Sequence, residues 1–152
     1  MCIRDSKPSQ LTEDQNTIPA SILWSLQGDA GQRALMAWAM GWSLAQQASG
    51  TNWQGWILAE LLNDSYDVVP LIAARSLRTL PGFNNFQADP IAPPAAREEN
   101  RSRAQEIWLE WRRSQDQHDN LANLFRSPSE SPESILARLL KTRNARRVEL
   151  AE

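Results

Sequence analysis

Apolar residues recur at helical spacing in four successive stretches of the first half of the chain. The stretches span about residues 18–27, 29–42, 53–63 and 67–80. Their apolar stripes include Ile22, Leu23, Leu26, Leu35, Trp38, Trp42, Ile57, Leu58, Leu61, Leu62, Leu71, Ile72, Ala74, Leu77 and Leu80. Residues that start or stop helices lie between the stretches, with Asp29 as a cap and Gly28 and Pro81–Gly82 as stops. The pattern therefore predicts four helices.

Either of two aspartates, Asp64 and Asp67, is placed to cap the fourth helix. With Asp64 as the cap, Pro70 lies beyond the first turn and clashes with a carbonyl, at a cost of about 3 kcal/mol. With Asp67 as the cap, Pro70 falls in the tolerated first turn. We therefore predict that Asp67 begins this helix.

The four helices form two similar pairs. Shifting the chain by 35 residues places Ile22 on Ile57 and Asp29 on Asp64, and a shift of 37 places Leu35 on Ile72. The difference between the two shifts falls at the turn within each pair, where insertions are tolerated. We infer one internal duplication of a helix pair.

The second helix of each pair resembles the second helix of a HEAT repeat. The resemblance lies in GDAGQRALMAWAMG and in the Asp-rich turn before VVPLIAARSL, and it covers about residues 18–82. It implies an α-solenoid in which an Asp caps the second helix and a Val-Arg pair starts the inner face of that helix. Arg33 matches the arginine position of the first repeat, whereas Pro70 replaces it in the second. The resemblance therefore does not imply a regular Asp–Arg ladder between repeats.

The second half of the chain has a different character. Residues 83–93 contain prolines without helical period, which predicts an ordered connector held by Phe83 and Phe86. Residues 94–152 form a helical cap and tail, with one charged helix at about 94–116 and a last helix beginning at Ser131-Pro132-Glu133. Their expected buried stripes are Ala104, Ile107, Trp108 and Trp111, then Ile135, Leu136, Leu139 and Leu140. Val148 and Leu150 of the tail either dock or hang free. The predicted fold is all-α: a short HEAT-like α-solenoid of two helix pairs, followed by a connector and two capping helices.

The first six residues, MCIRDS, match the translation of a transposase sequencing adapter, ATG TGT ATA AGA GAC AG. We therefore expect residues 1–6 to be an assembly artefact, residues 7–17 to be a polar linker, and the rest to come from the carboxyl-terminal part of a longer protein. A solenoid cut at one end leaves an apolar face unpaired. The helix carrying Ile22, Leu23 and Trp24 is expected to expose such a face.

Five of the seven tryptophans, Trp24, Trp38, Trp42, Trp53 and Trp56, fall within 33 residues. The favoured interpretation is that the rings fill the seam between stacked helices, each N–H finding a carbonyl. In the alternative, several exposed rings surround one concavity and bind a sugar or a quaternary amine.

Other candidate chemistry is sparse. The net charge of −2 offers no attraction to nucleic acid, and no apolar run approaches the ~20 residues needed to span a bilayer. The only cysteine is Cys2, and the only histidine, His118, lies in a polar stretch. We therefore predict no catalytic, metal-binding or cofactor-binding residues in this segment.

The layout also resembles the carboxyl-terminal region of bacterial multihaem c-type cytochromes that carry tetratricopeptide and HEAT repeats. The matching segments are GDAGQRALMAWAMGW, YDVVPLIAARSLRTLPGF and the Arg-rich last helix before VELAE. That resemblance implies a periplasmic electron-transfer parent whose haem sites lie upstream of this chain. The functional hypothesis is a non-catalytic scaffold or interaction segment that contacts the upstream part of its own chain or another protein. A distal cytochrome arm and a Trp-lined binding module are the two alternatives.

Overall fold

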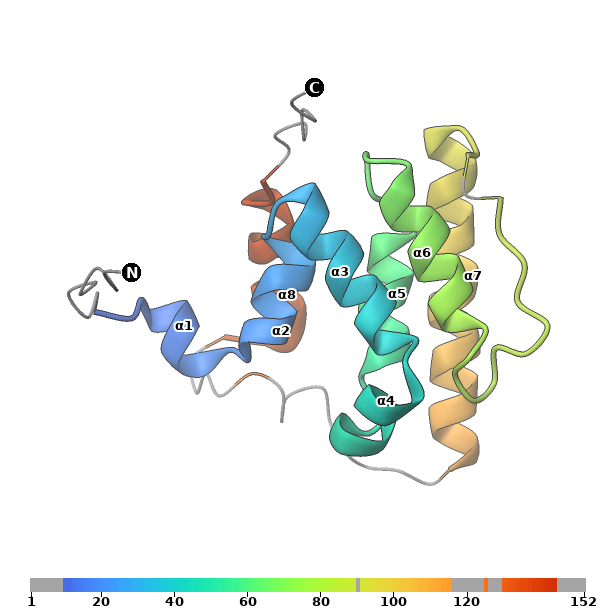
Figure 1. Cartoon of the computed structure of the whole chain (residues 1–152), viewed down its shortest axis with the longest axis horizontal. Helices are drawn as coiled ribbons and strands as arrows, with labels where there is room; N and C mark the ends of the chain where they lie inside the picture. The colour runs from blue at the N-terminus through green and yellow to red at the C-terminus, as the bar shows by residue number, and fades with distance from the viewer. Residues whose placement is uncertain (1–9, 90, 116–124, 126–129, 145–152) are drawn as a thin grey trace, which may run out of the picture.

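The computed structural model describes residues 10–89, 91–115, 125 and 130–144. These residues form helices and loops without strands, so the predicted all-α class is confirmed (Figure 1). The helices are α1 (Glu13–Thr17), α2 (Ala20–Leu26), α3 (Ala30–Met40), α4 (Ser43–Ser49), α5 (Gln54–Leu61), α6 (Val68–Leu77), α7 (Pro94–Ser114) and α8 (Pro132–Lys141).

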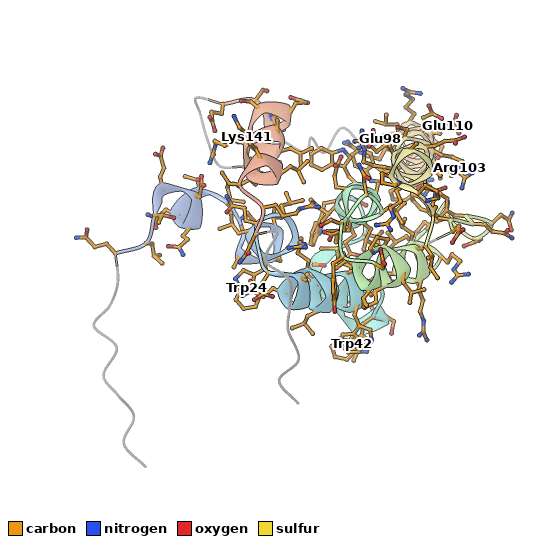
Figure 2. All side chains as sticks on the ribbon, turned by 90° about the horizontal axis from the view of Figure 1, so that it is seen from above. Trp24, Trp42, Glu98, Arg103, Glu110 and Lys141 are labelled. Atoms are coloured by element: carbon orange, nitrogen blue, oxygen red, sulfur yellow. The ribbon has the colours of Figure 1, made fainter. Side chains whose placement is uncertain are left out.

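The helices pack in two layers. Within each predicted pair the two helices contact each other, α2 against α3 and α5 against α6. Between pairs, α3 packs beside α6 in one layer, while α5 lies between α2 and α7 in the other (Figure 1). Helix α8 packs on the side of α2 that faces away from α3 (Figure 2). The central helices α2, α3 and α5 therefore each contact at least three other helices.

Helix α5 is the centre of the molecule, and all eight of its residues are buried. The predicted stripe of Ile57, Leu58 and Leu61 is confirmed, since each of these side chains is fully enclosed. The opposite side of α5, however, is also covered, by α7. A helix apolar all round is typical of such a central position.

The starts of α3 and α6 lie where the sequence predicts them. Asp29 accepts a hydrogen bond from the Gln32 backbone N–H at 2.8 Å, and the Gln32 side chain accepts one from the Asp29 N–H at 3.0 Å, completing a capping box. Helix α6 begins after Asp67, as predicted, and Pro70 lies in its first turn. The Asp67 side chain makes no capping bond and pairs instead with Arg97 at 2.6 Å.

Helix α3 is shorter than its sequence pattern predicts because it ends at Gly41, where the chain turns into α4. A Cβ placed on Gly41 would lie 2.5 Å from the Ser76 hydroxyl oxygen of α6. The glycine therefore allows the ends of α3 and α6 to approach more closely than any side chain permits.

Residues 7–17, expected to be a linker, include the short helix α1. Its start is a second capping box, between Thr12 and Gln15. The two hydrogen bonds of this capping box stabilise a helix start in a polar segment. The segment has no apolar periodicity, so the periodicity argument did not predict this helix.

The connector and the capping helices agree with their predicted contacts. Phe83 and Phe86 are buried and meet edge to face, with ring centroids 5.8 Å apart. Ala104 and Trp108 of α7 and Ile135 and Leu139 of α8 are buried, and the remaining predicted stripe residues pack against them.

The apolar face expected on α2 is absent. Ile22 is 1% exposed and Leu23 is 9% exposed, because α8 and α1 pack against α2. Of the three residues predicted to be uncovered, Trp24 alone is exposed. The carboxyl-terminal helix covers the position that we assigned to an upstream part of the protein.

Candidate functional site

Among the described residues, six of the ten exposed large apolar side chains lie on α2, on α3 and α6, or in the turn after α3. We call this set the aromatic face; its members are Trp24, Leu35, Trp38, Trp42, Val68 and Leu71. The tryptophans are between 48% and 57% exposed. Trp24 and Trp42 project from the same side of the molecule, and the labelled carboxylates of α7 lie on the opposite side (Figure 2).

The side-chain sizes along α3 explain why the rings face outward. The buried side of α3 consists of Ala30, Arg33, Ala37 and Met40, of which the alanines let α2, α5 and α6 come close. Leu35 and Trp38 lie three residues apart on the opposite side, and Trp42 continues that row. The prediction that these rings fill the seam between helices is therefore wrong for Trp24, Trp38 and Trp42.

The exposed rings are ordered against each other. Trp38 and Trp42 stack with centroids 6.2 Å apart and planes inclined by 19°. Because each ring covers one side of the other, the pair forms a flat platform. A cage around a cation would need rings at an angle to one another.

The remaining tryptophans take the predicted structural role. Trp56 is buried and stacks on Trp108, with centroids 6.4 Å apart. The Trp108 indole N–H donates to the Asn52 carbonyl at 2.9 Å, and the Trp53 N–H donates to the Ser49 carbonyl at 3.1 Å. Among the five clustered tryptophans, the expected N–H to carbonyl pairing is found for Trp53.

Two arginines border the aromatic face. Arg75 and Arg78 lie on the exposed side of α6 together with Leu71, and neither forms an ion pair with a residue that the structure describes. Gly41, which precedes Trp42 in the chain, closely approaches Ser76, which follows Arg75. A hydrogen bond of 2.8 Å from the Gln46 amide to the Thr79 hydroxyl fixes α4 to the same end of α6.

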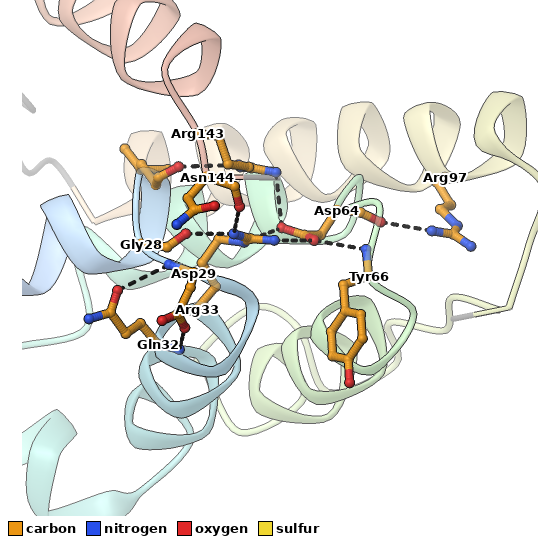
Figure 3. Close-up of polar contacts among 10 residues, drawn as sticks. Gly28, Asp29, Gln32, Arg33, Asp64, Tyr66, Arg97, Arg143 and Asn144 are labelled. Carbon is orange, nitrogen blue, oxygen red and sulfur yellow. Dashed lines mark hydrogen bonds and ion pairs between the residues drawn. The ribbon is translucent and has the colours of Figure 1, made fainter. Parts of the chain in front are cut away.

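A second polar constellation is buried between the helix pairs (Figure 3). Arg33 of α3 donates from Nε and Nη2 to the two carboxylate oxygens of Asp64, at 2.7 and 3.0 Å. Arg143, beyond α8, donates to the same carboxylate at 3.0 Å, and the backbone N–H of Tyr66 adds another bond at 3.0 Å. The Arg33 and Asp64 side chains are 1% and 0% exposed. Asp64 thus joins three distant segments of the chain.

Arg143 of this network and the nearby Glu60 have shifted pKa values. Burial lowers the pKa of the Arg143 guanidinium, against the attraction of Asp64. Burial also raises the pKa of the Glu60 carboxyl, although Arg101 of α7 opposes that effect. Glu60 accepts hydrogen bonds from Arg101 at 3.1 Å and from Gln105 at 2.5 Å. Other protein groups surround the carboxylates of Asp64 and Glu60. These two side chains therefore serve to hold helices together.

No protein-family model, no curated protein and no solved structure matches this chain. The aromatic face and the buried network are therefore interpreted from their own geometry.

Other predicted features fall in different places. His118, Val148 and Leu150 lie outside the described residues. Within the described part, no three His, Cys, Asp or Glu side chains are grouped as metal ligands. Nor is any described helix both long and apolar enough to cross a bilayer.

The sequence of α3 indicated two different sides, but the prediction that the tryptophans fill the seam between helices did not use this. The row Leu35, Trp38 and Trp42 and the row Ala30, Ala37 and Met40 lie on opposite sides of one helix. Hydrophobicity favours burial of the large residues, whereas close packing between helices favours the small ones. Which row faces inward depends on the distance between helices, which sequence spacing does not report.

Proposed function

We propose that this chain is a non-catalytic interaction segment of a larger bacterial protein, built as a short HEAT-like α-solenoid. The single observation that carries the proposal is the aromatic face. Exposed contiguous apolar surface on a folded domain is typical of contact sites, and tryptophan is enriched among the residues that dominate binding energy.

The buried network supports the HEAT-like interpretation of the fold. Arg33 stands at the arginine position of the first helix pair, and Asp64 aligns with Asp29 of that pair under the 35-residue shift. Their bidentate pair links successive helix pairs, although Pro70 prevents a further arginine of this kind in the second pair. Stacked pairs present a broad surface made of their second helices, here α3 and α6.

Site-specific photocrosslinking in the source organism tests this function. Trp38 is replaced by a photoreactive phenylalanine analogue in the full-length protein, and Leu109, an exposed residue of α7, is replaced in the matched control. We expect a discrete crosslinked product, within the parent chain or with another protein, from position 38 and none from position 109. Crosslinks from position 109 alone would place the contact surface elsewhere.

The exposed rings also keep the small-ligand alternative open. Titration with choline and with simple sugars, followed by tryptophan fluorescence, separates the two functions. Saturable quenching that Trp38→Ala abolishes, with no crosslinked product, would favour the binding module.

The multihaem parent stays a separate prediction about the gene. Reading the genomic sequence upstream of residue 7 tests it, because Cys-x-x-Cys-His motifs there identify a haem-binding parent.

A further inference from the structure

We infer that the aromatic face binds an acidic amphipathic helix. This inference rests on the proposed function and specifies the partner of the same surface. The partner helix places apolar side chains on Trp38, Trp42 and Leu71 and directs carboxylates to Arg75 and Arg78.

The distribution of charge identifies the sign of the partner. Residues 30–49 and 68–80, which form α3, α4 and α6, contain no Asp or Glu. Their arginines are Arg33, which is buried on Asp64, and the exposed Arg75 and Arg78. This layer therefore carries exposed positive charge in a chain of net charge −2. A carboxylate-bearing partner complements that charge and a lysine-bearing one is repelled.

The chemistry of the surface identifies the partner's conformation. The aromatic face consists of helix sides whose backbone groups are already bonded within α3 and α6, so it offers no free edge to an extended strand. A helix satisfies its own backbone groups and needs only side-chain contacts. The row of Leu35, Trp38 and Trp42 runs for about 10 Å, two turns of such a helix.

Two other occupants fit the charges less well. A second copy docked by its own aromatic face would add Arg75 and Arg78 of both chains to the contact, while the exposed carboxylate beside the face, Asp67, is already paired with Arg97. An anionic membrane attracts basic residues by about 1 kcal/mol each, and stable attachment uses clusters of roughly four to eight. Two arginines do not reach that number.

Three synthetic peptides of equal length test the inference. They share one leucine stripe at i, i+3, i+4 and i+7 spacing, and their flanking positions carry Glu, Gln or Lys. Binding is measured by fluorescence anisotropy of the labelled peptides. We expect the Glu peptide to bind about tenfold more tightly than the Gln peptide, as two exposed ion pairs allow, and the Lys peptide to bind more weakly than both.

A charge-reversed protein provides the decisive comparison. Arg75→Glu/Arg78→Glu alters exposed side chains without described partners, so we expect it to fold, as circular dichroism will show. It should prefer the Lys peptide, whereas Arg113→Glu, an exposed change on α7, should keep the original order.

Several outcomes overturn the inference. Equal affinity for the three peptides, or binding of none, removes the acidic helix as partner. Binding to vesicles containing 30% phosphatidylserine in place of the peptides indicates a membrane, and dimerisation that Trp38→Glu abolishes indicates a second copy. A crosslink from position 38 alongside negative peptide results would retain the proposed function and reject this partner.

Discussion

Asp64 illustrates how one residue can connect segments that the sequence separates widely. Its side chain accepts hydrogen bonds from Arg33 and Arg143, and its backbone carbonyl accepts one from Arg97 of α7 at 2.7 Å. Arg33 also donates to the backbone carbonyls of Gly28 and Asn144, at 2.6 and 2.8 Å (Figure 3). Buried charges in such a network depend on each other, because removing one leaves its partners desolvated without compensation.

We expect Asp64→Asn to lower the free energy of unfolding by about 3–5 kcal/mol, since it leaves two arginines without their shared carboxylate. Urea denaturation followed by circular dichroism measures the change. The control is Asp67→Asn, an exposed carboxylate paired with Arg97, for which about 0.2–1 kcal/mol is expected. Similar losses in the two variants would contradict the role assigned to Asp64.

Glu60 predicts a dependence of stability on pH. Burial raises the pKa of this carboxyl in the folded protein, so the folded state holds the proton more strongly than the unfolded state. The stabilising contribution of the protonated form is present below the ordinary glutamate pKa and is lost as pH rises through the raised value. Compared with Glu60→Gln, the wild-type protein should therefore lose stability as pH rises above the ordinary glutamate pKa.

Urea midpoints of the wild-type protein and of Glu60→Gln, measured below and above the ordinary glutamate pKa, give this difference in stability. Carboxylates that do not interact with Glu60 titrate equally in the two proteins, so their contributions to the difference cancel. A wild-type protein that gains stability relative to Glu60→Gln as pH rises would show that pairing with Arg101 outweighs burial.

At the scale of elements, small residues determine how closely the helices pack. Gly55 of α5 faces α7, and a Cβ at this position would lie 2.6 Å from Cδ1 of Trp108 and 3.3 Å from Phe83. Gly41 plays the same part between α3 and α6. The rings of Trp108 and Phe83 therefore occupy space that a glycine leaves free.

We expect Gly55→Ala to destabilise the protein by about 1–3 kcal/mol, because the added methyl group forces the Trp108 ring to move. Thermal unfolding followed at 222 nm measures the effect. Gly31→Ala in α3 is the matched control: its Cβ would meet only the Asp29 side chain, at 3.3 Å, and we expect a change below about 1 kcal/mol. A neutral Gly55→Ala would mean that α7 is not tightly seated on α5.

At the scale of the whole molecule, α8 covers the side of α2 that faces away from α3 (Figure 2). Ile135 and Leu139 are fully buried against it, and the segment after α8 returns to the helix pairs through Arg143 and Asn144. The Asn144 backbone N–H donates to the Gln27 carbonyl at 3.1 Å. The last described helix is therefore an integral part of the core.

We expect Leu139→Ala to lower the free energy of unfolding by about 2–5 kcal/mol, the usual effect of a cavity at a fully buried leucine. Hydrogen exchange should show amide protection falling in α3 and α5 as well as in α8, in one cooperative transition. Leu109→Ala, on the exposed side of α7, should change stability by about 0.5 kcal/mol or less. Loss of protection in α8 alone would show that α8 unfolds independently.

Local chemistry in the sequence determined most of the elements. The Asp29 cap, the start of α6 after Asp67 and the buried stripes of α7 and α8 follow from capping, from proline geometry and from apolar periodicity, which act within a few residues. The short helix α1 and the break at Gly41 were missed, because one depends on polar capping alone and the other on contact with α6.

Only the tertiary structure decided what the candidate site is. Which side of α3 faces solvent depends on the spacing between helices, and that spacing is set by Ala37, Gly41 and their partners on other helices. The network of Arg33, Asp64, Arg143 and Asn144 joins residues up to 111 positions apart, two of which follow α8. Periodicity along one helix shows that two sides differ, but burial is decided by what packs against each side.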